Sequence, residues 1–176
     1  MATAVRSETS PEFAAAYRDA VLHSIENEIG ITRRVLEAVP DNKRDFKLDP
    51  KARPAGDLAW HIASDDVIFL DAIAEMKFNF PDTRYDKQRP TTSAAVGEWY
   101  EKNMKRAVDK IRAMTPAQLA TPVNFLNMFN FPAAFYLDFM VKHSVHHRGQ
   151  LSAYLRPMGS KVPSIYGGSA DEPMNF

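Results

Sequence analysis

Four long stretches of this sequence carry apolar residues at steps of three and four, and this spacing constrains the fold more than any other feature. Such steps place the apolar side chains on one face of an α-helix, which a bundle turns inward. The four predicted helices run from Pro11 to about Val39, from Pro54 or Ala55 to about Met76, from Thr92 or Ser93 to Met114, and from Pro132 to near Arg156. Ser10 is the expected N-cap of the first, and Thr92 or Ser93 that of the third. Alternation typical of strands is almost absent, so we predict an all-α four-helix bundle.

The first three predicted helices are joined by long polar connections. Residues 41–53 and 77–90 are rich in charged residues and proline, which is typical of loops. Connections of this length allow a crossover between helices in place of a tight hairpin. After the third helix, Thr115 precedes Pro116 and is expected to cap one short extra turn of helix.

The remaining segments complete one predicted domain of residues 1–176, a length sufficient to bury a proper core. Residues 1–9 are expected to form a flexible tail. The segment 121–131 is apolar but contains three asparagines, and we predict an irregular packed connection there. Residues 159–176 are rich in glycine, proline and serine and are expected to form an ordered loop that folds back over one end of the bundle.

The charge and the cysteine content restrict the class of protein. Lysine plus arginine and aspartate plus glutamate both number 22, so no basic excess indicates nucleic-acid binding. No segment resembles a signal peptide or a membrane span, and we expect a soluble cytoplasmic protein without a membrane partner. The chain contains no cysteine. A metal site must therefore use histidine, carboxylate or water, and any thiol must come from another molecule.

The last predicted helix contains two histidines four residues apart, His143 and His147. That spacing stacks both imidazoles on one helix face, where they can bind a single metal ion. Both lie in the apolar stripe that a bundle buries. His146 points about 100° away from His147 and cannot easily share the ion. Two core histidines held by ordinary hydrogen bonds are the alternative interpretation of this pair.

The second predicted helix offers a third histidine, His61, on its inward face. Asp65 lies one turn later, and a simple hydrogen bond between these two residues is the alternative to a metal site. Three inward-facing imidazoles on two helices favour a divalent ion, with zinc or nickel expected and an open fourth position. Such a site needs partners that orient the imidazoles. The candidates for that role are Asp65, Asp138, Gln150 and Tyr154.

Three sequence segments resemble the DinB-like (YfiT-type) superfamily of metal-dependent four-helix-bundle proteins. They are LAWHIASDD at 58–66, HSVHHRGQLSAYLRPMG at 143–159 and KVPSIYG at 161–167. The resemblance implies a divalent metal on His61, His143 and His147. It also implies a homodimer formed through helix faces, for which the sequence offers Phe69, Phe78, Phe80 and Trp99. Characterised members of the superfamily include transferases and isomerases that use bacillithiol, mycothiol or glutathione.

We therefore expect a metal-dependent enzyme, a thiol-dependent S-transferase or a hydrolase, acting on a small molecule. A low-molecular-weight thiol is the expected cosubstrate of the transferase. The alternative is a non-catalytic, metal-containing stress-response or binding protein. A further alternative is a mononuclear iron oxygenase that uses His143, His147 and Asp65 as ligands.

Overall fold

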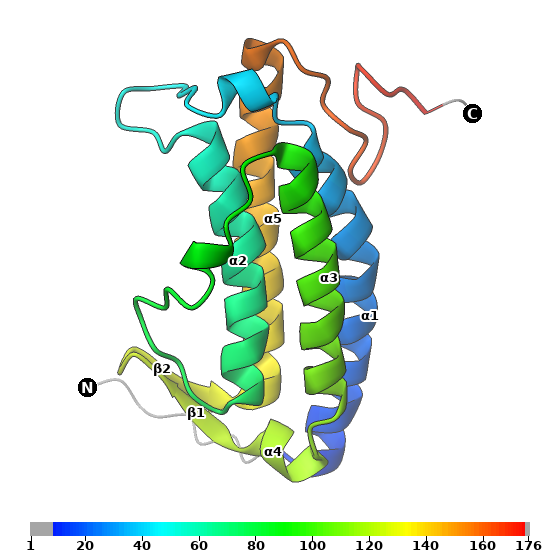
Figure 1. The fold of residues 1–176 in the computed structure, drawn as a ribbon. Helices are drawn as coiled ribbons and strands as arrows, with labels where there is room; N and C mark the ends of the chain where they lie inside the picture. The colour runs from blue at the N-terminus through cyan, green and yellow to red at the C-terminus, as the bar shows by residue number, and fades with distance from the viewer. Residues whose placement is uncertain (1–8, 175–176) are drawn as a thin grey trace.

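The computed structural model describes residues 9–174 and contains four long helices packed side by side (Figure 1). The helices are α1 (Pro11–Glu37), α2 (Ala55–Ala74), α3 (Ser93–Arg112) and α5 (Tyr136–Leu155). The predicted all-α bundle is thus confirmed. Apart from Thr9, the tail predicted for residues 1–9 lies outside the described residues.

Three helices begin at the capping side chains that the sequence indicated. Ser10 accepts a hydrogen bond from the backbone N–H of Phe13 at 3.2 Å, and Thr92 accepts one from the N–H of Ala95 at 3.3 Å. The short helix α4 (Pro116–Ala120) begins with a reciprocal cap between Thr115 and Gln118. These side chains satisfy N–H groups that have no partner within the helix.

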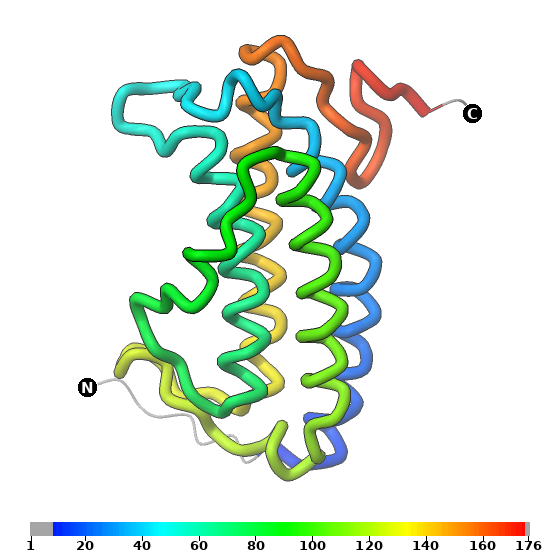
Figure 2. Tube along the Cα trace, viewed as in Figure 1, coloured from blue at the N-terminus to red at the C-terminus, as the bar shows by residue number. Residues whose placement is uncertain are grey.

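The connection between α2 and α3 runs back along the whole bundle, so these two helices point in the same direction (Figures 1 and 2). Each of them packs against the other and against one further helix, α3 against α1 and α2 against α5. Residues 75–92 therefore form a crossover that follows one side of α2. Trp99 fixes this crossover by donating a hydrogen bond to Gln88 Oε1 at 3.1 Å.

The segment after α4 is an antiparallel β-hairpin, so the irregular connection predicted for residues 121–131 was wrong. Strand β1 (Pro122–Phe125) pairs with β2 (Phe129–Pro132). Leu126 and Asn127 have φ angles of 53° and 59°, and the Met128 N–H closes the turn on the Phe125 carbonyl at 2.9 Å. Strands of only four residues joined by a turn without glycine leave little periodic signal.

The last long helix starts later than predicted. Pro132 ends β2, and a 3₁₀ turn from Ala133 to Phe135 leads into α5 at Tyr136. Beyond α5, the C-terminal segment packs on the end of α1, where Ser160 donates to the Ala38 carbonyl at 2.6 Å. The ordered C-terminal loop expected from the sequence is therefore present through residue 174.

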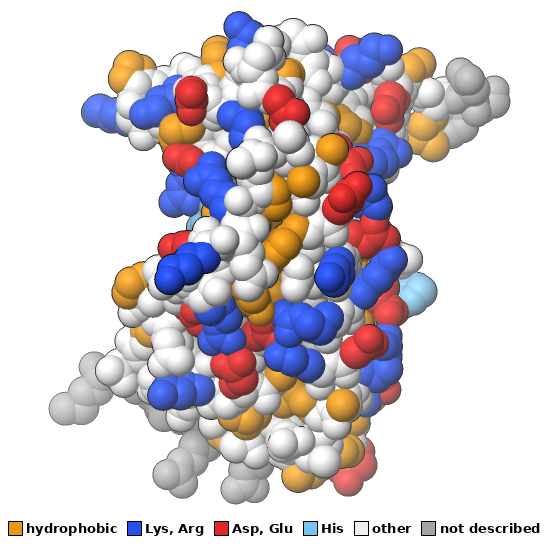
Figure 3. Space-filling model, in the orientation of Figure 1, with side chains coloured by type: hydrophobic (Ala, Val, Ile, Leu, Met, Phe, Trp, Pro, Cys, Tyr) orange, Lys and Arg blue, Asp and Glu red, His pale blue; other side chains and the backbone are white. Residues whose placement is uncertain are grey.

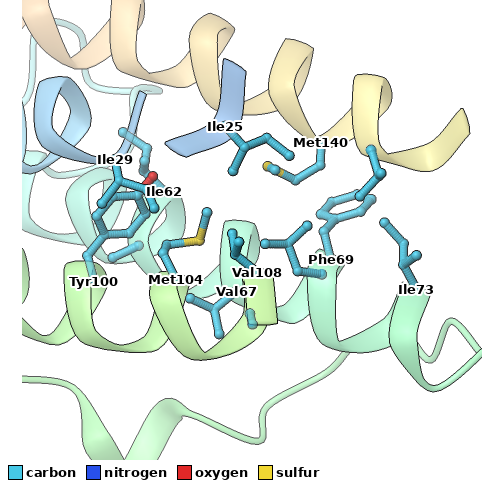
Figure 4. Packing of buried hydrophobic residues seen from close by; sticks show 14 of the residues in the cluster. Ile25, Ile29, Ile62, Val67, Phe69, Ile73, Tyr100, Met104, Val108 and Met140 are labelled. Carbon is cyan, nitrogen blue, oxygen red and sulfur yellow. The ribbon is translucent and has the colours of Figure 1, made fainter. Parts of the chain in front are cut away.

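The core lies between the four helices, and each helix contributes to it (Figure 4). Ile25 of α1, Val67 of α2, Met104 of α3 and Met140 of α5 are all at most 2% exposed. Phe69 and Phe78 are also buried, so the prediction that they are free for a dimer interface was wrong. Both rings pack on Phe125 of the hairpin, which the sequence did not predict.

A buried carboxylate, Asp71 of α2, binds α2 to α3. Its oxygens accept hydrogen bonds from Arg106 at 2.8 and 3.0 Å and from Lys110 at 2.7 Å. Tyr85 of the crossover also donates to it. Burial raises the pKa of this carboxyl, but the hydrogen bonds together outweigh burial and lower the pKa to about 2. Asp71 therefore stays ionised and anchors the crossover to both helices.

Charged side chains of both signs are interspersed over the face formed by α1 and α3 (Figure 3). No single sign dominates that face, which agrees with the formal net charge of zero. Within residues 9–174, none of the helices has the length and apolar character needed to cross a membrane.

Candidate metal centre

The bundle brings together the three histidines that the sequence singled out. His61 comes from α2, and His143 and His147 come from neighbouring turns of α5. One nitrogen from each ring lies within 4.8 Å of the others. The ring centroids are 4.5 Å apart for His61–His147 and for His143–His147, and 5.1 Å apart for His61–His143.

Two of the rings are held at Nδ1 by oxygen acceptors. The Nδ1 of His61 lies 2.9 Å from Asp65 Oδ2, and the Nδ1 of His147 lies 3.0 Å from Gln150 Oε1. Because these acceptors carry no hydrogen of their own, each Nδ1 must carry the proton. A neutral imidazole has one donor and one acceptor nitrogen, so in the neutral form of each ring the Nε2 atom presents a lone pair.

Those two lone pairs face one another. The Nε2 atoms of His61 and His147 are only 3.3 Å apart. Two acceptors at this distance repel unless a cation or a proton lies between them. Burial lowers the pKa of His147, with smaller contributions from the neighbouring histidines, and this disfavours a proton on the ring. The arrangement of these histidine nitrogens therefore fits a metal ion. Neutral imidazoles suit zinc, nickel, copper or iron.

The third histidine faces an aspartate that the sequence did not predict. The Nδ1 of His143 lies 3.8 Å from Asp66 Oδ1, and both atoms are buried without a hydrogen-bond partner among residues 9–174. The other oxygen of Asp66 accepts hydrogen bonds from Ser144 at 2.6 Å and from Tyr100 at 3.2 Å. Burial is the largest effect on the Asp66 carboxyl and raises its pKa. These hydrogen bonds and the nearby His143 lower the pKa by less.

Two of the partners predicted for the histidines lie elsewhere. Asp138 pairs with Lys142 at 2.6 Å on the surface of α5, and Tyr154 donates to the Arg53 carbonyl at 3.0 Å. Helical spacing alone places Tyr154 on the same stripe as His147, but the axial distance between them is about 10 Å, which is too far for contact. The structure also places Asp65 behind His61, where it holds the ring and is not among the three clustered histidines. This geometry contradicts the oxygenase ligand set of His143, His147 and Asp65.

A polar hollow of about 240 Å³ opens beside His61. Trp60, Ser64 and Asp65 of α2 form one wall, and Asp82 and Asp86 of the crossover form another. Its volume suits a small molecule or part of one. The long connection between α2 and α3 thus lines one side of the space next to His61.

Comparison with known proteins assigns the chain to a family. The family model described as "DinB family" matches residues 14–174. The chain belongs to the DinB family. The match extends from the start of α1 to the C-terminal segment, so it covers the bundle and all three clustered histidines.

Several DinB relatives match along almost their whole length. The uncharacterized protein YrdA of Bacillus subtilis is 26% identical over 159 residues, which cover 90% of this chain and 93% of YrdA. A DinB-like protein of Bacillus cereus superposes with a TM-score of 0.70 at 26% identity, covering 84% of this chain and 97% of its own. The DinB-like protein YjoA of B. subtilis has the same fold, with a TM-score of 0.63, 18% identity and coverage of 82% and 96%.

Proposed function

We propose that this DinB protein is a metal-dependent enzyme, a thiol S-transferase or hydrolase, that binds one divalent ion on His61, His143 and His147. The observation that carries the proposal is the 3.3 Å approach of the Nε2 atoms of His61 and His147. An ion on three histidines retains an open position and supplies Lewis-acid chemistry that lowers the pKa of a thiol or a water. Zinc and nickel are the ions we propose.

The surroundings of the histidines support a small-molecule substrate. The hollow beside His61 is lined mainly by polar side chains, including Arg53 and Asp57 at its rim. The chain has no cysteine, so the thiol of a transferase must be a separate low-molecular-weight molecule. The hollow would hold this cosubstrate, the electrophile, or the compound to be hydrolysed, next to the ion.

The enzymatic proposal is tested with metal-depleted protein that is reconstituted with zinc or nickel. We expect the reconstituted protein to conjugate an aryl halide with glutathione, bacillithiol or mycothiol, or to hydrolyse an activated ester. The rate should fall to background in the metal-depleted protein and in His147→Ala. His146→Ala is the matched control, since His146 is exposed on the same helix.

The same preparation separates an enzyme from a metal-containing binding protein. In a cobalt-substituted enzyme, azide should change the visible spectrum because it enters the open position. A spectrum that does not respond, together with no turnover of any thiol or ester, would contradict the enzymatic proposal. That result would support a non-catalytic protein in which the metal only stabilises the fold.

We also propose that the protein is a homodimer, joined through an aromatic surface on the hairpin and α5. This hairpin face surrounds a hollow of about 290 Å³ and includes Phe129, Phe131, Phe135 and Phe139. Phe129, Phe131 and Phe139 are between 41% and 48% exposed. With Phe13 beside them, they present roughly 400 Å² of apolar surface. A stable interface buries about 800 Å² on each partner, part of which is a polar rim.

The dimer is tested by light scattering after gel filtration. We expect a mass of twice the 19.8 kDa chain for the wild type and a monomer for Phe129→Ser combined with Phe131→Ser. Leu48→Ser is the control, because Leu48 is similarly exposed but lies on the α1–α2 connection. A wild type that elutes as a 19.8 kDa monomer at micromolar concentration would contradict this proposal.

A further inference from the structure

One buried carboxylate near the histidines has an unusual environment. Asp66 is fully buried on α2, and its Oδ1 has no hydrogen-bond partner among residues 9–174. The nearest charged or polar atom of the histidine cluster is the Nδ1 of His143, at 3.8 Å. That nitrogen is likewise buried and unpaired. Buried polar atoms nearly always have a hydrogen-bond partner. Two such atoms that face each other without one indicate a hydrogen bond that forms in another state of the protein.

The tautomer of His143 decides whether this bond forms. A neutral imidazole carries its single proton on Nδ1 or on Nε2. With the proton on Nε2, the Nδ1 lone pair faces a carboxylate and repels it. With Nε2 engaged by a cation, the proton must sit on Nδ1, and Asp66 Oδ1 becomes its acceptor. A shortening of about 0.8 Å then gives a normal hydrogen bond.

We infer that Asp66 is a positioning residue that holds His143 through Nδ1 and leaves its Nε2 for the divalent ion. This inference rests on the proposed metal site. It gives all three histidines the same arrangement, because Asp65 holds His61 and Gln150 holds His147 in the same way. Carboxylates that hold the far nitrogen of a metal-bound histidine fix its tautomer and its orientation.

The neighbours of Asp66 make it rigid enough for this role. Ser144 and Tyr100 both donate to Oδ2, at 2.6 and 3.2 Å, and both are buried. Ser144 follows His143 directly on α5, while Tyr100 comes from α3. The carboxylate is therefore fixed from two helices, with Oδ1 left to face the imidazole. Asp66 is a part of the site that connects α2, α3 and α5.

The substitution Asp66→Asn tests the inference because these donors determine how the amide would lie. Its oxygen would accept from Ser144 and Tyr100, so its NH₂ group would face His143. That group donates a hydrogen bond to Nδ1 and would favour the imidazole tautomer with its proton on Nε2. A protonated Nε2 has no lone pair for the metal ion. We expect zinc affinity, measured by competition with a chelating dye, to fall by about 10- to 100-fold or more.

Asp71→Asn is the matched control. Asp71 is a buried aspartate on the same helix, but it is bound by Arg106 and Lys110 and not by a histidine. It should change zinc affinity by less than about threefold, which is well below the loss of about 10- to 100-fold expected for Asp66→Asn. The shift in melting temperature produced by zinc gives a second readout, which should be small in Asp66→Asn and unchanged in Asp71→Asn.

A direct readout is the Nδ1 proton of His143 in the NMR spectrum of zinc-loaded protein. It should be protected from exchange in the wild type and absent in Asp66→Asn. If Asp66→Asn does not fold, Ser144→Ala carries the test, because it removes the shorter hydrogen bond to Asp66 and should weaken zinc binding severalfold. Wild-type affinity in Asp66→Asn, or in Ser144→Ala as its replacement, would overturn the inference.

Different results would overturn the proposed metal site and the role of Asp66. Wild-type protein that binds no zinc or nickel would overturn the proposed function itself. Wild-type protein that binds the ion, with an equal loss of affinity in Asp66→Asn and Asp71→Asn, would overturn only the role of Asp66. Such an equal loss would mean that any buried aspartate of α2 supports the fold in general.

Discussion

Replacing His147 by alanine is expected to remove the metal from the protein. His147 contributes one of three clustered nitrogens, and its Nε2 is the one that lies 3.3 Å from that of His61. Two remaining histidines form an incomplete site, so affinity should fall by more than the ~100-fold upper range for a residue that only orients a ligand. Elemental mass spectrometry should find about one zinc or nickel per chain in the wild type and almost none in the variant.

The neighbouring residue supplies the control for this experiment. His146 is exposed and lies on another face of α5, so His146→Ala should retain the wild-type metal content. His23 is exposed on α1 and serves as a second control. Equal metal content in the wild type and in His147→Ala, after incubation with divalent ions and removal of the excess, would contradict the three-histidine site.

Replacing Arg148 by alanine is expected to give a large loss of stability. Arg148 is 1% exposed, and its guanidinium donates hydrogen bonds to Glu28, to Thr32 at 2.9 Å and to the Tyr166 hydroxyl. The variant leaves the Glu28 carboxylate, which is 18% exposed, without its buried partner. Removing one member of a buried ion pair costs about 3–5 kcal/mol. Urea unfolding of metal-free protein, followed by circular dichroism, measures this loss.

Two further variants determine the cause of that loss. Arg148→Met combined with Glu28→Gln removes both charges and retains most of the volume, so it should cost less than Arg148→Ala alone. Arg156→Ala removes a more exposed arginine, which pairs with Asp171 at 3.0 Å, and should cost less than about 1 kcal/mol. A loss of under 1 kcal/mol in Arg148→Ala would show that the buried network contributes little to stability.

The Arg148 network also explains why the C-terminal segment packs on the bundle. Arg148 follows His147 on α5 but points to another side of the helix, where it contacts Glu28 of α1 and Tyr166. Arg34 of α1 holds the same segment through the Ser164 carbonyl at 2.8 Å and Glu172 at 2.7 Å. Two faces of α5 therefore make different contacts. One carries the clustered histidines, and another carries Arg148, which holds the C-terminal segment.

The sequence by itself determined the bundle and the three histidines. Helical spacing and the capping residues Ser10, Thr92 and Thr115 are local signals, because they depend on side chains within one or two turns of each other. The same spacing identified His143 and His147. His61 became a candidate because a polar residue on an inward-facing stripe needs a partner.

Only the tertiary structure decided the direction of α3, the hairpin and the position of Asp66 beside His143. The path of a long connection depends on which faces pack together, and the four-residue strands are stabilised by the packing of Phe125 on Phe69 and Phe78. Asp66 had no signal of its own, because α2 is buried on most sides and its periodicity does not show which residue a given side chain meets. Its partner His143 lies 77 positions away in the sequence. Contacts of that kind are set by the packing of one helix on another, and periodicity within a single helix carries no information about them.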